Sequence, residues 1–197
     1  MNNLTVRRSL LASFLPLLLV TQAVGHSPDS IESEMTPENP KKSWALYGEF
    51  LTGEEVFTVK LAYDEGFALP LEVLVPQQDV WADHRPVFAV VGPGLPAPTA
   101  AVRDLLPKSL PDNVGVYYEP NDQEERATFY EPFLGTDFWT SEPIALTLDA
   151  GEHEIWIWSP NETTGRFTFG FGVEEEHGPS EIFELIFNAD AYDDSAD

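Results

Sequence analysis

The chain has 197 residues and a formal net charge of −24, from 34 Asp and Glu against 10 Lys and Arg. Nucleic-acid binding needs clustered Lys and Arg that displace counterions, and the few basic residues here are scattered among acids, so nucleic acid is excluded as a partner. Cysteine is absent, which excludes disulfides, thiolate nucleophiles and cysteine-based metal sites. A hydrophobic fraction of 43% suffices for a packed core.

Residues 1–25 have the features of a secretory signal peptide. Arg7 and Arg8 precede a leucine-rich run, and small residues follow at Ala23 and Gly25, so that cleavage after either one fits the pattern. The paired arginines are also compatible with a twin-arginine export signal. The run is too short to span a bilayer comfortably, and no later segment approaches that length. We therefore expect a secreted or periplasmic protein with no membrane span in the mature chain.

Without residues 1–25 the chain keeps eight basic and all 34 acidic residues, a net charge of −26. That length suits one domain. So large a charge repels itself in dilute buffer, and salt screens the repulsion, which predicts a higher melting temperature in molar salt. The plainer interpretation is that an acidic surface keeps a secreted protein soluble.

Residues 26–43 are rich in prolines and acids, which is typical of a flexible, extended lead-in. From Trp44 onward, short segments of period two alternate with turn residues. These segments are residues 54–63, 69–76, 86–92, 114–119, 144–148, 153–159 and 166–173. Seven or eight such strands without an intervening helical period predict an all-β fold, an antiparallel β-sandwich over residues 44–187, followed by an acidic tail over residues 188–197.

The segment 166–173 is the clearest strand. Phe167, Phe169 and Phe171 share one face and are expected in the core, while glycines on the opposite face indicate that another element approaches closely. The strand 153–159 is the candidate for that neighbour.

The strand 153–159 is apolar on both faces, because Trp156 and Trp158 alternate with isoleucines, and such a strand must be covered on both sides. Three candidates for the cover remain open: the irregular aromatic segment 129–139, a ligand, and the segment 180–187. The last has apolar residues at helical spacing behind a serine cap, and it is equally compatible with a short closing strand.

Residues 148–172, LDAGEHEIWIWSPNETTGRFTFGFG, resemble the closing hairpin of bacterial pre-peptidase C-terminal domains, in which an Ala-Gly turn precedes an aromatic-rich strand. Residues 43–61 resemble the opening strands of such domains, and residues 86–96 are similar to a segment of uncharacterised secreted relatives. The resemblance covers most of residues 44–173. It implies a jelly-roll-like β-sandwich that serves as an accessory or binding module outside the cell, here without the peptidase domain that usually accompanies it.

Motifs of catalysis are absent from the sequence, including GxSxG, HExxH, the phosphate-binding GxxxxGK[ST] and a Gly-rich dinucleotide loop. Pairs of carboxylates are too frequent in so acidic a chain to indicate glycosidase chemistry. The sequence therefore favours a protein without intrinsic catalysis.

A copper site is the alternative from another class. Cleavage after Gly25 makes His26 the N-terminal residue, whose α-amino and imidazole nitrogens together suit copper. This resembles the histidine brace of copper monooxygenases and periplasmic copper carriers. The second imidazole would come from His84, His153 or His177. The competing interpretation is that His26 merely follows a signal peptide in an acidic segment.

Calcium is a second candidate ion, because residues 119–125 and 188–194 hold carboxylates and amides at short spacing. Both segments lack the glycine of an EF-hand loop, and solvated acidic loops explain them equally.

Aromatic residues are the candidates for ligand binding, since exposed rings stack on sugars or anchor protein partners, whereas rings that plug an open end of the sandwich do neither. The candidates are Phe129, Tyr130, Phe133, Phe138 and Trp139, with Trp81 elsewhere, and Trp156 and Trp158 if they line a cleft. Asn161 also meets the N-glycosylation sequon. The expected function is a non-catalytic binding or accessory module for an extracytoplasmic protein or glycan.

Overall fold

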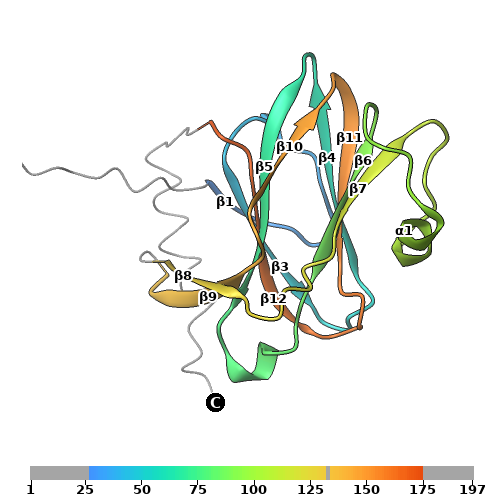
Figure 1. Cartoon of the computed structure of the whole chain (residues 1–197). Coiled ribbons are helices and arrows are strands. Elements are labelled where there is room, and N and C mark those ends of the chain that lie inside the picture. Colours follow the sequence, from blue (N-terminus) through green and yellow to red (C-terminus); the bar gives the residue numbers. More distant parts are fainter. Residues whose placement is uncertain (1–26, 132–133, 175–197) are drawn as a thin grey trace, which may run out of the picture.

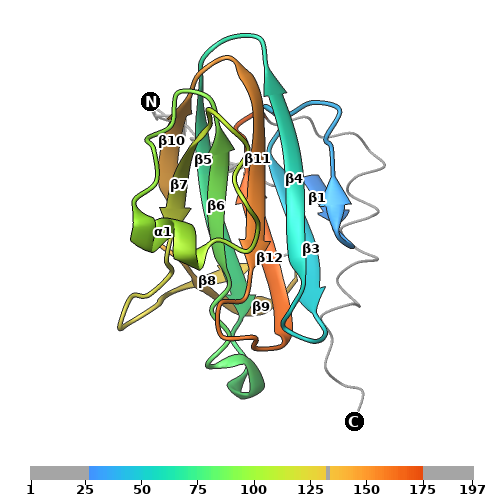
Figure 2. The same ribbon diagram turned by 90° about the vertical axis from the view of Figure 1, so that its right-hand side faces the viewer.

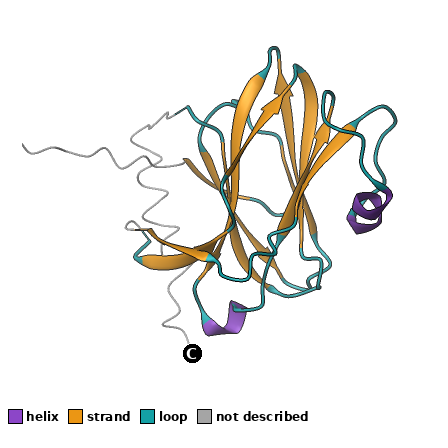
Figure 3. Cartoon of the chain, viewed as in Figure 1, coloured by secondary structure: helices purple, strands orange, loops and turns teal. Residues whose placement is uncertain are grey.

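The computed structural model describes residues 27–131 and 134–174, which form two β-sheets packed face to face (Figure 1). Strands dominate this part of the chain (Figure 3), and it contains no helix long and apolar enough to cross a membrane. The elements are β1 Ser27–Ser30, β2 Glu34–Met35, β3 Trp44–Phe50, β4 Val56–Tyr63, β5 Phe67–Pro76, the 3-10 helix η1 Asp79–Trp81, β6 Val87–Gly92, α1 Ala100–Leu105, β7 Gly115–Glu119, β8 Ala127–Glu131, β9 Thr136–Thr140, β10 Ile144–Leu148, β11 Gly151–Trp158 and β12 Gly165–Phe171.

Eight of these strands form a jelly roll. One sheet carries the order β3-β12-β5-β10, and the facing sheet carries the order β4-β11-β6-β7. Every pairing within these two sets is antiparallel. The chain crosses repeatedly from one sheet to the other, as two Greek keys require. The predicted all-β sandwich and its jelly-roll-like topology are confirmed.

The core lies between the sheets because alternate residues of each strand point inward. Phe167, Phe169 and Phe171 of β12 are at most 1% exposed, as their spacing predicts. At one end of the core, the rings of Phe50, Phe57 and Phe167 lie 5.0 to 5.1 Å apart, centroid to centroid. Such clusters of aromatic side chains contribute much of the buried apolar area of a small sandwich.

Residues 27–43 do more than lead into the sandwich. β1 pairs in parallel with β3, and β2 pairs in parallel with β4, so each sheet gains one short edge strand. Between these strands the side chain of Ile31 enters the core and is 4% exposed. The sheets are therefore mixed, and the sandwich begins ahead of Trp44. Backbone pairing holds β1 and β2 in place, and their polar sequence carries no alternation that could reveal it.

The prediction that β11 lies beside β12 is wrong. β12 lies between β3 and β5, whereas β11 belongs to the other sheet, between β4 and β6. In a jelly roll these two consecutive strands face each other across the core instead of pairing as a hairpin. Gly170 makes room for a side chain on its own sheet, since a Cβ there would lie 3.1 Å from Cγ of Glu72.

The described cover of the tryptophans is not the aromatic segment 129–139, and the candidate segment 180–187 lies outside the described residues. Trp156 and Trp158 are 2% and 6% exposed and pack with the outer residues of β6 and β7. Segment 93–114, which contains α1, lies over this face of the sheet (Figure 2) and adds Val102, Leu106 and Leu110 to the cluster. This segment is Pro-rich and only weakly periodic, so its apolar residues gave no signal of a covering element.

Candidate functional site

The two described histidines of the copper hypothesis lie far apart. His153 is near the start of β11, whereas His84 contacts Thr163, which follows the end of the same strand. The five steps along the strand from His153 to Trp158 span about 16 Å, so one ion cannot bind both imidazoles. His26 and His177 lie outside the described residues. Within the described ranges, no three His, Asp or Glu side chains gather as a metal site.

His84 is part of a buried hydrogen-bond chain. Its Nδ1 lies 2.9 Å from Oγ1 of Thr163, which in turn lies 2.9 Å from Oγ of Ser159. The imidazole is 1% exposed and packs edge-on against Phe50 at 5.3 Å. Burial, and then the positive charge of Arg126, lower the pKa of His84 to about 4. His84 is therefore neutral at physiological pH and inaccessible to a ligand in solution.

His153 sits at the opposite end of the core. Its ring lies against Gly92, where a Cβ would approach Cδ2 of His153 within 2.2 Å, so only glycine fits there. A hollow of about 520 Å³ opens beside β4 and the start of β11, lined in part by Lys60, Glu152 and Glu154. Neighbouring residues of a strand face opposite sides, so the glutamates lie outside the sheet and the buried His153 ring lies on the core side. The hollow is therefore mainly acidic; His153 also belongs to its lining, but its side chain is almost fully buried.

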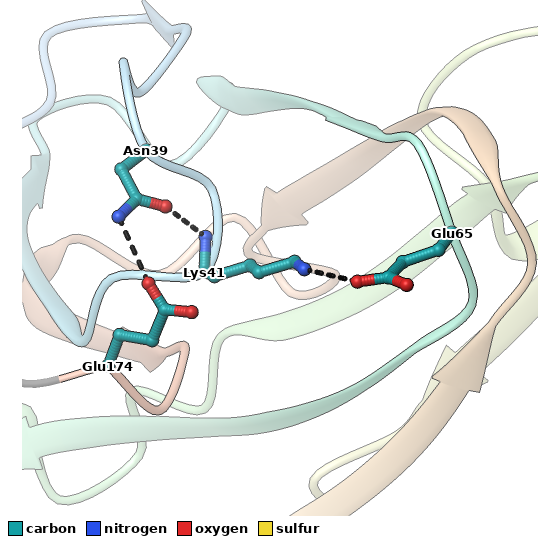
Figure 4. A network of polar contacts seen from close by, with 4 residues as sticks. All are labelled: Asn39, Lys41, Glu65 and Glu174. Carbon is teal, nitrogen blue, oxygen red and sulfur yellow. Dashed lines mark hydrogen bonds and ion pairs between the residues drawn. The ribbon is translucent and has the colours of Figure 1, made fainter.

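Polar contacts near this end hold the chain together (Figure 4). Lys41 Nζ forms an ion pair with Glu65 at 3.0 Å, and Asn39 Oδ1 accepts from the backbone N–H of Lys41 at 3.0 Å. The Asn39 amide donates to the carboxylate of Glu174 at 3.2 Å. These groups satisfy one another, so the network fastens the segment that follows β12 to residues ahead of β3.

The aromatic candidates divide into buried and exposed residues. Trp156 and Trp158 are core residues and line no cleft. Trp139 is half-buried on β9, and Tyr130 on β8 is 56% exposed. Among the other rings, Phe129 is 45% exposed, Phe138 is buried, Trp81 is half-buried and Phe133 lies outside the described residues. The segment 127–140 is thus a β-hairpin, not the irregular segment that the sequence predicts.

Several loops converge on the end of the sandwich where this hairpin lies (Figures 1 and 2). We call it the aromatic end; it consists of the turns 51–55 and 159–164, the segments 77–86 and 120–126, and the β8–β9 hairpin. Hydrogen bonds join these parts: Gln77 N–H donates to Asp137 O at 2.7 Å, and the Arg85 guanidinium donates to Gln123 O at 2.8 Å. The arrangement is a connected surface built on the two sheets.

Arg126 is the residue that ties the hairpin to the loops. Its guanidinium donates to the carbonyl oxygens of Ala82 at 2.6 Å and His84 at 3.1 Å, and it lies 3.9 Å from the ring centroid of Trp139. Burial, and then the nearby charge of Arg85, lower the pKa of Arg126 to about 10. The side chain remains charged at neutral pH, with its donors directed at backbone carbonyls.

The sequence did not predict two exposed apolar side chains of the aromatic end. Leu51 is 72% exposed and Val80, in η1, is 78% exposed. The Glu55 carboxylate holds the turn below Leu51, since it accepts from the N–H groups of Leu51, Thr52 and Gly53 at 2.8 to 3.1 Å. Slight burial acts to raise the pKa of Glu55, but these hydrogen bonds outweigh it and the pKa is lowered. The turn is rigid, and it presents Leu51 to solvent.

In the segment 119–125, one of the two calcium candidates, side chains with oxygen atoms are engaged with other protein groups. Glu119 accepts from the hydroxyl of Tyr117 at 2.8 Å, and the Asn121 amide donates to Pro86 O at 2.9 Å. These contacts hold the segment against β6 and β7. Residues 188–194 lie outside the described residues.

Comparisons with known proteins bear on the fold. No family model matches the sequence, and no curated protein matches it. A solved structure to which this chain is similar is the pre-peptidase C-terminal domain of the collagenase from Bacillus anthracis. The identity is 8% and the TM-score 0.35, over 75% of this chain and 98% of that chain.

Proposed function

We propose that this protein is a secreted or periplasmic, non-catalytic binding module that contacts an extracytoplasmic partner through the aromatic end. The observation that carries the proposal is that the loops and the hairpin of this end hold most of the large apolar side chains exposed in the described residues. Leu51, Val80, Phe129 and Tyr130 are four of the six large apolar side chains exposed in the described part of the chain. Exposed apolar groups that cluster on a rigid support are typical of interaction surfaces.

The surroundings of these side chains support binding rather than catalysis. The groups at this end whose pKa values are shifted already have partners. His84 contacts Thr163, Arg126 donates to backbone carbonyls, and Glu55 accepts from backbone N–H groups. A copper function would depend on His26, which lies outside the described residues, because His84 and His153 are buried away from solvent. The geometry therefore favours a docking surface.

Immobilised full-length protein tests the proposal when it is exposed to the extracytoplasmic fraction of the source cells and to a panel of oligosaccharides. We expect a retained partner with wild type and a marked loss with Val80→Ser or Tyr130→Ser. Leu105→Ser is the matched control, because Leu105 is 49% exposed on α1, away from the aromatic end. Equal retention by all four proteins would show that the aromatic end is not the docking surface.

A further inference from the structure

The sheet edges of this protein are not equally protected. β1 contains Pro28, β2 has two residues, and the N–H of Val116 on β7 already donates to Pro96 O at 2.9 Å. Short strands, prolines and covering loops are the means by which proteins block pairing at a sheet edge. β8 has five residues with no proline, no lysine and no bulge, and among the described residues it pairs only with β9.

β10 is the other edge without a cover in the described chain, and it differs from β8 in its side chains. Its exposed residues are Ala145 and Thr147, which offer little area for contact. β8 exposes Phe129 and Tyr130, on opposite faces of the strand. A strand that pairs with β8 would therefore meet an aromatic ring on each side, in addition to the backbone groups of the edge.

The charges around β8 indicate the chemistry of its partner. Glu124, Glu125 and Asp137 are exposed beside the hairpin. The cations nearby are directed at backbone carbonyls: Arg126 donates to Ala82 O and His84 O and lies over Trp139, and Arg85 donates to Gln123 O. The whole chain carries a net charge of −24, so a second copy would be repelled and a basic segment attracted. Tyr130 and Phe129 also suit contact with a Lys or Arg cation.

We propose that β8 accepts an extended, Lys- or Arg-bearing segment of a partner protein as an additional strand of the seven-stranded sheet. The proposal rests on the proposed function and specifies the partner of the same surface. Backbone hydrogen bonds would provide the pairing, the two aromatic rings would provide the anchors, and the surrounding carboxylates would select a basic sequence.

A synthetic peptide of alternating Lys and Val with blocked termini tests the proposal on the full-length protein. We expect saturable binding that weakens as salt is added, because exposed charges are screened. Tyr130→Ser should weaken binding about tenfold, as expected for an aromatic anchor, and Leu105→Ser should leave it unchanged. The same peptide with N-methyl groups on every residue has no N–H group on either edge, cannot pair as a strand and should not bind. An alternating Glu and Val peptide should not bind either.

Amide hydrogen exchange provides the decisive readout. A paired strand protects the N–H groups of β8 that point away from β9, so protection should rise at every second residue between Ala127 and Glu131. Uniform protection, or equal binding of the N-methylated peptide, would overturn strand addition while leaving the docking surface intact. A sugar that competes at Phe129 and Tyr130 without this pattern would identify the surface as a glycan site and likewise overturn the proposal. If every variant of the aromatic end instead retains the partner as well as wild type does, the proposed function itself is refuted.

Discussion

The guanidinium of Arg126 lies 3.9 Å from the ring centroid of Trp139 and, from that position, donates hydrogen bonds to the carbonyls of Ala82 and His84. One side chain thereby joins the start of β8, the strand β9 and the segment that carries η1. The geometry depends on a planar group with several donors, which arginine has and lysine lacks.

We expect Arg126→Lys to destabilise the protein by about 1 to 2 kcal/mol, because an ammonium cannot stack on Trp139 and donate to both carbonyls at once. Urea unfolding followed by tryptophan fluorescence measures the change. Arg103→Lys is the matched control, since Arg103 is exposed on α1 and should change stability little. Equal effects of the two substitutions would contradict the role assigned to Arg126.

The buried His84 predicts a loss of stability in acid. Burial, and then Arg126, lower its pKa from 6.5 to about 4, so the unfolded chain binds a proton between these values that the folded chain does not. Its contribution is therefore complete above pH 6.5 and is lost progressively as the pH falls toward 4. The loss amounts to at most about 3 kcal/mol.

The His84→Asn variant isolates this contribution, because an amide can keep the contact with Thr163 and cannot titrate. The free energy of unfolding of each protein is measured from pH 7 to pH 4. Carboxyl groups affect both proteins alike, including Glu72, whose pKa is raised by burial and which favours the folded state in acid. We expect a smaller decline for the variant, and parallel curves would show that His84 does not carry the effect.

The turn at Gly53 is predicted to tolerate no side chain. Its φ is +84°, and a Cβ would lie 2.1 Å from the backbone oxygen of Glu162 in the adjacent loop. Gly53→Ala should cost more than about 2 kcal/mol, from backbone strain together with the clash. Gly135→Ala should cost only about 1 kcal/mol, because its φ is +63° and nothing lies within 4 Å. Similar melting temperatures for the two variants would refute the tight contact between the turns.

The acidic composition predicts stabilisation by salt. With 34 acidic against 10 basic residues, charges of one sign repel one another in the folded protein more than in the expanded chain. Screening should therefore raise the melting temperature steadily across a sodium chloride series into the molar range. A melting temperature that stays flat or falls would show that the surface charges do not limit stability.

The alternation of apolar residues was enough to predict the central strands. The segment 144–148 coincides with β10, and the three phenylalanines of β12 lie in the core, because a period of two places one residue set on one face whatever else the chain does. Hydrophobic burial then requires two such faces to meet, so the sandwich follows from the sequence.

The partners of the strands were decided by the tertiary structure. β11 and β12 are consecutive strands, yet they lie in different sheets, and a loop of weak periodicity covers Trp156 and Trp158. The candidate site depends on the same long-range packing, since the turn 51–55, the segment 77–86 and the β8–β9 hairpin are far apart in sequence and lie at one end of the sandwich (Figure 1). Side-chain alternation is a local property of the chain, whereas pairing and convergence depend on contacts between distant residues, which no local pattern encodes.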